Sequence, residues 1–323
     1  MPVDVFLSGL IFADVVFTGL PKAPELGEEI WSDGLGVGPG GIANFAVALS
    51  RLGLRTSLAA AFGDDFFGRW AWETLEKDEG IDLSHSRLFA GWPMPVTAAL
   101  AYAGDRALVS HGRDTPVPLD ELAGSPPACR AAIVHLTEHP PGWLPAVADA
   151  GGLVFADVGW DPAGAWSPDL LDPLAHCHAF LPNEHEAMAY TRTGSAAAAL
   201  SRIADLVPLA VITRGRAGAL AADATTGETA EVGGLPVTAV DPTGAGDVFG
   251  AALVAGTLAG WPLADRLRFA NLCAALSVQG PGGARSAPDW AAVARWWQRH
   301  RATDAGFYGF LDDVIPLPAK ELT

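Results

Sequence analysis

The chain has 323 residues, of which 50% are hydrophobic and 18% are charged, so a large core is expected and disorder is not. Its 20 Lys and Arg stand against 37 Asp and Glu, and the formal net charge of −17 argues against a nucleic-acid partner and against an anionic membrane surface. A nucleotide is not excluded, because backbone dipoles and a metal ion can hold one locally.

The cysteines and the apolar runs indicate a cytoplasmic protein. The apolar run 5–20 contains Asp14 and no basic segment precedes it, so we expect a first strand there and not a signal peptide. The uncharged run 248–264 is rich in Gly and Ala, which favours a buried helix of a soluble core over a membrane span. The three cysteines are widely spaced, which is typical of reduced thiols and does not match a disulfide framework or a zinc site. They are Cys129, Cys177 and Cys273.

Short apolar runs recur along the chain, and each is followed by a helical pattern. This alternation predicts an α/β fold in which helices cover both faces of a mostly parallel sheet. The expected strands are 3–10, 57–62, 131–136, 152–156, 179–181 and 209–213. The clearest expected helices are 42–52, 65–79 and 248–258, and a glycine follows each of the first two.

Two regions, 12–37 and 94–111, break this rhythm. The second is a credible β-hairpin with its turn at 103–105. Together they predict a small sheet that projects over an active site as a lid and excludes water during chemistry. We expect one domain over residues 1–323, with the lid as its subdomain. The strands expected in the lid are 12–18, 29–33, 96–102 and 106–111.

The glycine-rich run 34–44 contains a formal G-x-G-x-x-G match at Gly36, Gly38 and Gly41. A dinucleotide site, and with it an oxidoreductase, is the alternative that this spacing raises. The preceding segment 28–33 is too polar for the central parallel strand that the motif requires, which argues against this alternative.

The heptapeptide Asp-Pro-Thr-Gly-Ala-Gly-Asp at 241–247 runs straight into an apolar helix. Backbone N–H groups around Gly244 and Gly246 could face an anion at the helix N-terminus, and the Asp247 carboxylate follows at once. This combination suits phosphoryl transfer to an alcohol, because the carboxylate takes the hydroxyl proton while the backbone holds the phosphoryl group. The plainer alternative is that Thr243 or Asp241 caps an ordinary helix.

The heptapeptide resembles the C-terminal signature of the ribokinase-like, or PfkB, family of carbohydrate and nucleoside kinases. Three further segments resemble elements of that family, and the resemblance spans residues 14 to about 284. These segments are Gly40-Gly41-x-Ala43-Asn44, Asn183-x-x-Glu186 and Thr213-x-Gly215-x-x-Gly218. The resemblance implies a ribokinase-like three-layer α/β/α domain with a small β-sheet lid, and often a homodimer formed through that lid.

The resemblance also implies ATP and Mg²⁺ as cofactors. Glu186 would act on Mg²⁺ through water, and Asp241 with the carbonyl group of Thr243 would hold a monovalent cation such as K⁺. Taken without the family, Asn183 and Glu186 equally form a capping box at a helix start. The residues implied to lie at the nucleotide are Asn183, Thr213, Gly215, Gly218 and Asn271.

A polyol site is expected on the other side of the heptapeptide. Paired glycines let a sugar lie close on the backbone, and an Asn amide offers both a donor and an acceptor to vicinal hydroxyls. A carboxylate inside an apolar run is costly if it is buried without a partner, and substrate hydroxyls would satisfy it. The residues expected to bind the substrate are Asp14, Gly40, Gly41, Asn44 and Glu138. The alternatives are an exposed edge position for Asp14, a local side-chain to backbone bond for Asn44 and a solvated loop position for Glu138.

These patterns predict an ATP-dependent kinase that phosphorylates a hydroxyl group of a small sugar-like substrate. Asp247 would be the general base, with the helix dipole favouring its ionised form, and Gly244, Ala245 and Gly246 would form the anion hole. The non-enzymatic alternative is a nucleotide- or sugar-binding sensor on the same scaffold.

The acceptor stays open among a nucleoside, a hexose and a keto-deoxy sugar acid. The scarcity of lysine favours an unphosphorylated acceptor, whereas Arg106 and Arg113 near the lid hairpin keep a sugar acid or a phosphosugar open. Phe12 stands where ribokinase has a polar residue, which counts against ribose.

Overall fold

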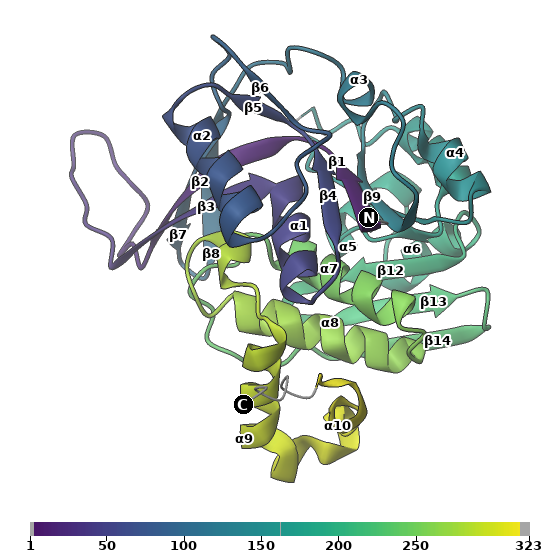
Figure 1. The fold of residues 1–323 in the computed structure, drawn as a ribbon. Helices are drawn as coiled ribbons and strands as arrows, with labels where there is room; N and C mark the ends of the chain where they lie inside the picture. The colour runs from purple at the N-terminus through teal and green to yellow at the C-terminus, as the bar shows by residue number, and fades with distance from the viewer. Residues whose placement is uncertain (1–2, 162, 317–323) are drawn as a thin grey trace, which may run out of the picture.

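The computed structural model of the chain describes residues 3–161 and 163–316 (Figure 1). Its centre is an eight-stranded sheet with the strand order β14-β13-β12-β11-β10-β9-β1-β4. The strands β13 (Ala219–Asp223) and β14 (Glu228–Val232) pair antiparallel at one edge. The other pairings are parallel, so the prediction of a mostly parallel sheet is confirmed. The parallel strands are β1 (Val3–Ser8), β4 (Thr56–Ala59), β9 (Cys129–Leu136), β10 (Leu153–Val158), β11 (Ala179–Phe180) and β12 (Leu209–Thr213).

Helices cover both faces of this sheet, because successive strand side chains point to opposite sides (Figure 1). In β1, Val5 and Leu7 enter one core, whereas Phe6 enters the other. The first core contains side chains from α1 (Ile42–Arg51), α2 (Phe66–Glu73), α7 (Ala245–Leu258), α8 (Leu263–Ser277), α9 (Trp290–Tyr308) and α10 (Leu311–Val314). The second contains side chains from α3 (Leu119–Ala123), α4 (Leu144–Asp149), the 3-10 helix η2 (Pro168–His176), α5 (Glu184–Thr191) and α6 (Ala196–Ala204).

The predicted elements differ from the observed ones mainly at their ends. The expected helix 65–79 is α2 capped by Asp65, whose side chain accepts a hydrogen bond from the Gly68 N–H, and it continues as a π-helical turn, η1 (Thr74–Asp78). The expected strand 57–62 is divided between β4 and β5 (Ala61–Gly63), and β5 pairs with β6 (Arg87–Phe89) in a separate ribbon.

Helix α7 lies in the centre of the first core. A Cβ atom at Gly250 would come within 2.5 Å of the Phe45 ring, so the glycine lets α7 pack closely against α1. The expected buried helix in this region is confirmed, since residues 248–254 are buried. Within the ranges 3–161 and 163–316, no helix has the length and apolar character that crossing a membrane requires.

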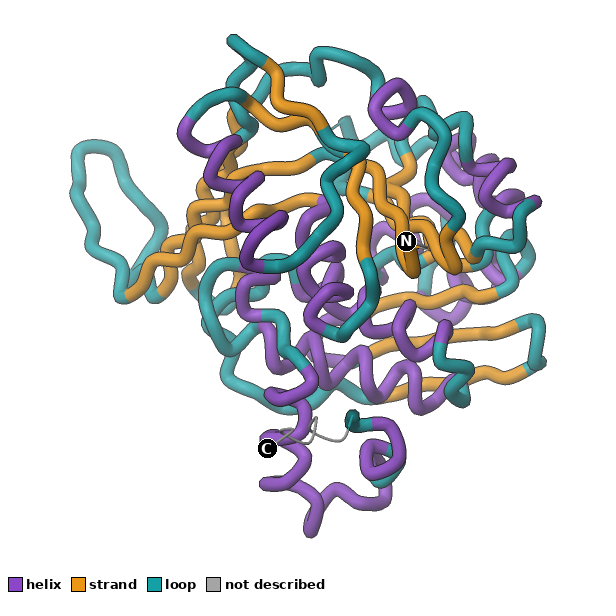
Figure 2. Tube along the Cα trace, in the orientation of Figure 1, coloured by secondary structure: helices purple, strands orange, loops and turns teal. Residues whose placement is uncertain are grey.

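A second sheet has the order β3-β2-β7-β8 and projects from the main body (Figures 1 and 2). It consists of β2 (Ile11–Thr18), β3 (Gly34–Gly41), β7 (Val96–Tyr102) and β8 (Asp105–His111). The expected hairpin is present as β7 and β8, with Ala103 and Gly104 at its turn. Strand β2 joins the two halves, because it pairs antiparallel with β3 and parallel with β7.

The expectation of a strand at 29–33 is wrong. This segment belongs to the loop 19–33, which extends away from the body, and the strand is the glycine run itself (Figure 2). Glycine is required there by close packing, since a Cβ atom at Gly36 or Gly38 would come within 2.6 to 2.7 Å of the Gly282 backbone. Gly36 and Gly38 therefore lie inside an antiparallel strand and not in the strand-to-helix turn that follows a parallel strand in a dinucleotide fingerprint.

Candidate active site

The two glycine motifs meet at one hydrogen bond. Asn44, in the first turn of α1, donates from Nδ2 to Oδ2 of Asp247 in the first turn of α7, at 2.9 Å. These residues are 203 positions apart in sequence. The fold therefore places the expected substrate-binding amide directly against the expected base.

The start of α7 has no side-chain cap. Its N-cap residue Gly244 has φ 72°, a left-handed conformation that glycine adopts without strain. Asp241 does not cap α7; its carboxylate accepts hydrogen bonds from the N–H groups of Thr243, Gly282 and Gly283 at 2.9 to 3.1 Å. The Thr243 hydroxyl is buried and has no hydrogen-bond partner within the described residues, so a polar atom faces this turn unsatisfied.

Asp247 carries a raised pKa of about 7. Burial is the main cause, the carboxylates of Asp14 and Glu186 add to it, and the hydrogen bond from Asn44 opposes it. We expected the helix dipole to favour the ionised form of this carboxyl, but burial sets the direction of the net pKa shift, which is upward. A base with a pKa near 7 is suited to take a proton at neutral pH.

Asp14 lies beside this base on the second sheet. It is buried on β2, and desolvation together with the charge of Asp241 raises its pKa to about 6. A Cβ atom at Gly40 would overlap the Asp14 carboxylate, so Gly40 is what lets this side chain lie across β3. Gly41, at φ 62°, then turns the chain into α1. Of the expected polyol residues, Asp14, Gly40, Gly41 and Asn44 thus form one group.

Glu138 makes no hydrogen bond to this group among the described residues. It is exposed in the loop after β9, and its carboxylate makes no hydrogen bond or ion pair within the described part of the chain.

The Asn183 and Glu186 pair forms a capping box at the start of α5. Asn183 Oδ1 accepts from the Glu186 N–H at 3.0 Å, and Glu186 Oε2 accepts from the Asn183 N–H at 2.9 Å. Glu186 is buried, and desolvation raises its pKa. Its charge in turn raises the pKa of Asp247, so the capping residue also faces the candidate base.

The Thr213 to Gly218 turn lies next to this capping box. The Thr213 N–H donates to the Pro182 carbonyl at 3.1 Å, and a bridge joins Asn183 to Thr213. Gly215 and Gly218 have φ of 54° and 89°, and a Cβ atom at Gly218 would overlap the Val232 carbonyl.

Asn271 is buried on α8 and not solvated. Its Nδ2 donates to the carbonyl groups of Val232 and Gly233, both at 3.2 Å, and thereby fixes the chain that leaves β14 beside the turn of Gly218.

Two side chains near the base were missed by sequence reasoning. His135 on β9 and Asp157 on β10 stand side by side in parallel register, and with Asp247 they form a group whose possible ligand atoms all lie within 4.8 Å of one another. Burial lowers the pKa of His135 to about 4, whereas burial and the charges of Glu186 and Asp247 raise the pKa of Asp157 well above its ordinary value. The position of Asp157 at the carboxyl end of a predicted strand was the available signal.

Comparison with known proteins finds one family. A model of the pfkB family carbohydrate kinases matches residues 27–290. The chain is 32% identical over 310 residues to a ribokinase of Schizosaccharomyces pombe, which covers 88% of this chain and 95% of that protein. It is 31% identical over 277 residues to a fructokinase of Klebsiella pneumoniae, which covers 77% of this chain and 89% of that protein.

Solved structures show the same fold. A ribokinase of Arabidopsis thaliana complexed with ribose and ATP has a TM-score of 0.71 at 22% identity and covers 91% of this chain and 98% of that one. An E. coli protein assigned as a ribokinase II, in complex with ATP and Mg²⁺, has a TM-score of 0.75 at 23% identity and covers 92% of this chain and all of that one.

Proposed function

Since the chain belongs to the pfkB family of carbohydrate kinases, we propose that it transfers the γ-phosphoryl group of ATP to a hydroxyl group of a small sugar or nucleoside, with Asp247 as the general base. The observation that carries this proposal is the hydrogen bond between Asn44 and Asp247. This bond brings the residues expected to bind the polyol into contact with the Asp247 carboxyl. The pKa of about 7 of that carboxyl suits proton abstraction.

In the proposed reaction, the substrate hydroxyl donates its proton to the Asp247 carboxylate. The substrate oxygen attacks the γ-phosphorus atom, the bond from that phosphorus to the β-γ bridging oxygen breaks, and ADP leaves. Asp14 and Asn44 orient the acceptor, while the backbone of Gly244, Ala245 and Gly246 stabilises the charge that develops on the phosphoryl oxygens.

The chemistry of the neighbouring side chains fits Mg²⁺. Asp157, Glu186 and Asp247 bring three carboxyl groups together, and none of them pairs with a Lys or Arg within the described residues. Glu186 would hold the ion through water, with Asp157 beside it. When bound, the ion neutralises the negative charge of the ATP phosphates.

A monovalent cation such as K⁺ is proposed beside Asp241. The Asp241 carboxylate is buried and accepts hydrogen bonds from the N–H groups of Gly282 and Gly283. The Thr243 carbonyl lies near Gly283. A cation there would take carbonyl and carboxylate oxygens and would support the turn before α7. Replacing KCl by choline chloride in the assay tests this part of the proposal.

For the nucleotide, we propose a site along the capping box of Asn183 and the turn from Thr213 to Gly218, with Asn271 supporting the adenine end through the backbone that it holds. For the acceptor, Asp14 and Asn44 provide acceptor and donor groups to vicinal hydroxyls. Glu138 would join them only if its exposed loop closed over a bound substrate.

A homodimer through the second sheet is the proposed assembly. The face of this sheet that is opposite to Asp14 carries Val15, Phe17, Leu35, Leu100 and Val109, because residues paired across strands share a face. Leu35 is 59% exposed and Val109 is 64% exposed, which suits burial against a second copy.

A panel of phosphate acceptors tests the function. Purified protein with ATP and Mg²⁺ is expected to release ADP with at least one pentose, hexose, nucleoside or sugar acid, and Asp247→Asn is expected to lower kcat by about 10²- to 10⁴-fold while ATP binding persists. Asp149→Asn, at an exposed acid on α4, is the matched control and should keep full activity. ATP binding without turnover on any acceptor would favour the sensor alternative.

A further inference from the structure

A groove of about 780 Å³ lies outside the candidate active site, between α9, the end of α8, η1 and the 3-10 helix η4 (Gly283–Ser286). No residue of the proposed nucleotide or acceptor sites lines it. Its lining includes four arginines, Arg51, Arg285, Arg295 and Arg299. This collection of positive charge is unexpected in a chain with a formal net charge of −17.

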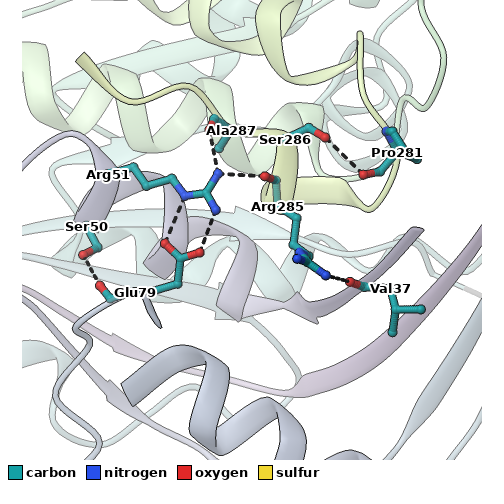
Figure 3. Close-up of polar contacts among 8 residues, drawn as sticks. All are labelled: Val37, Ser50, Arg51, Glu79, Pro281, Arg285, Ser286 and Ala287. Carbon is teal, nitrogen blue, oxygen red and sulfur yellow. Dashed lines mark hydrogen bonds and ion pairs between the residues drawn. The ribbon is translucent and has the colours of Figure 1, made fainter. Parts of the chain in front are cut away.

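Two of these arginines are held in place by the protein (Figure 3). Arg51 donates to both carboxylate oxygens of Glu79, at 2.6 and 3.0 Å, and to the carbonyl groups of Arg285 and Ala287, at 2.7 and 2.8 Å. The Arg285 guanidinium reaches across to the Val37 carbonyl of β3 at 2.9 Å. The inner wall of the groove thus consists of two arginines that other parts of the protein hold by hydrogen bonds.

The other two arginines have no partner among the residues that the structure describes. Arg295 and Arg299 are exposed one helical turn apart on α9, and their guanidinium groups contact no acid, carbonyl or ring in the described part of the chain. The acids of the groove do not neutralise them. Glu79 pairs with Arg51, whereas Asp78 and Asp289, the cap of α9, form no ion pair with Arg295 or Arg299 among the described residues. The four arginines of the lining therefore exceed its three acids by one positive charge.

We propose that this groove binds a small molecule that carries phosphoryl groups. Paired guanidinium forks match phosphate oxygens in geometry and charge. The polar side chains of Thr74, Gln279 and Ser286 supply further donors and acceptors, and the volume suits a ligand of mononucleotide size or smaller. Because no aromatic ring of the described residues lines the groove, the site favours a phosphorylated sugar or free phosphate over a nucleobase.

The groove is connected to the candidate active site through η4. The N–H groups of Gly282 and Gly283 bind Asp241 just before α7, while Arg285 in the same segment faces the groove and holds β3. An anion that binds the Arg285 guanidinium would therefore shift the segment 282–285, which contacts both the turn before α7 and strand β3 of the lid. The ligand is expected to change the acceptor KM.

Isothermal titration of the full chain tests the site with inorganic phosphate, pyrophosphate, ribose 5-phosphate and ribose. The double variant Arg295→Gln/Arg299→Gln is expected to bind the phosphorylated probes at least tenfold more weakly than the wild type. Arg202→Gln, which removes an exposed arginine on α6, is the matched control and should leave binding unchanged. Rising KCl should weaken binding in the wild type.

Two arms of the experiment distinguish the source of the phosphoryl group. Equal affinity for inorganic phosphate and ribose 5-phosphate assigns the groove to free phosphate, and preference for ribose 5-phosphate assigns it to a phosphorylated sugar. Equal binding by the wild type and the double variant would overturn the proposal, as would the absence of binding at 10 mM of every phosphorylated probe. A probe-induced change in acceptor KM that persists in the double variant would place its action elsewhere and would equally count against the groove.

Discussion

At the scale of single residues, the candidate site is a set of carboxyl groups that oppose one another's ionisation. Asp14, Asp157, Glu186 and Asp247 all have raised pKa values, and desolvation is the largest cause for each. A cation and a polyol would relieve this repulsion. Binding of a cation and a polyol should therefore stabilise the ionised form of these buried carboxyl groups.

The acid limb of the pH–rate profile should report Asp247. Its raised pKa of about 7 means that kcat/KM falls as the pH is lowered through 7, because the protonated carboxyl accepts no proton. The Asn44 hydrogen bond lowers this pKa, so Asn44→Ala should move the limb to higher pH as well as lower the rate. Gln298→Ala, on the exposed side of α9, should leave the limb in place, and an unmoved limb in Asn44→Ala would contradict the assignment.

Gly40→Ala should damage acceptor binding while leaving ATP binding intact. The added methyl group would overlap the Asp14 carboxylate and displace it, so we expect the acceptor KM to rise by about tenfold or more with a small change in the ATP KM. Gly194→Ala, where nothing lies within 4 Å of an added Cβ atom, is the control. Equal KM values in the two variants would show that Asp14 does not position the acceptor.

Residues of the candidate site that carry a signal in the sequence, such as a motif, could be predicted, whereas those without one could not. The motifs and the family resemblance led us to expect roles for Asp14, Asn44 and Asp247. The contact between Asn44 and Asp247 depends on how α1 packs against α7. His135 was not predicted, because a lone histidine inside an apolar strand has no local signal. Its place beside Asp157 follows from strand register alone.

At the scale of elements, residue propensity did not predict strand β3, because close packing determines where that strand lies. Sequence reasoning placed a strand at 29–33 and interpreted the following glycines as a substrate-binding or dinucleotide-binding motif, not as a strand. The structure uses those glycines as β3, because the neighbouring η4 segment and the Asp14 carboxylate leave no room for side chains. The regular βαβ part of the chain was predicted well because its apolar runs are long and buried on both faces.

Arg51 should be a large contributor to stability among the ion pairs of the chain. It joins α1 to the end of η1 and to η4 with four hydrogen bonds, and its side chain is 25% exposed and that of Glu79 10%. Arg51→Ala is expected to lower the free energy of unfolding by about 2–4 kcal/mol. Chemical denaturation measures this loss.

Lys77→Ala serves as the comparison for Arg51. The ion pair of Lys77 with Glu73 is 64% and 66% exposed, so its removal should cost at most about 0.5 kcal/mol. Glu79→Gln should lie between the two variants, because Arg51 keeps its carbonyl contacts. Equal losses in Arg51→Ala and Lys77→Ala would show that η4 is not held by Arg51.

At the scale of the whole molecule, the two faces of the second sheet differ in chemistry. One face carries Asp14, which we propose to bind the acceptor, and the opposite face exposes the apolar side chains of Leu35 and Val109. A monomer would leave this apolar face in water, whereas a second copy placed on it would bury the face and stiffen the lid. The proposed dimer thus links assembly to acceptor binding.

Leu35→Glu combined with Val109→Glu should separate the proposed dimer into monomers. Each introduced carboxylate would have to be buried at the interface, so the molar mass from light scattering should fall from about two chains to one, and the acceptor KM should rise more than the ATP KM. Leu206→Glu, at a leucine that is 43% exposed beyond α6, controls for charge and should leave the dimer intact. A wild-type protein that elutes as a monomer at every concentration would refute the dimer. A monomeric variant with unchanged acceptor KM would show instead that the lid closes without its partner.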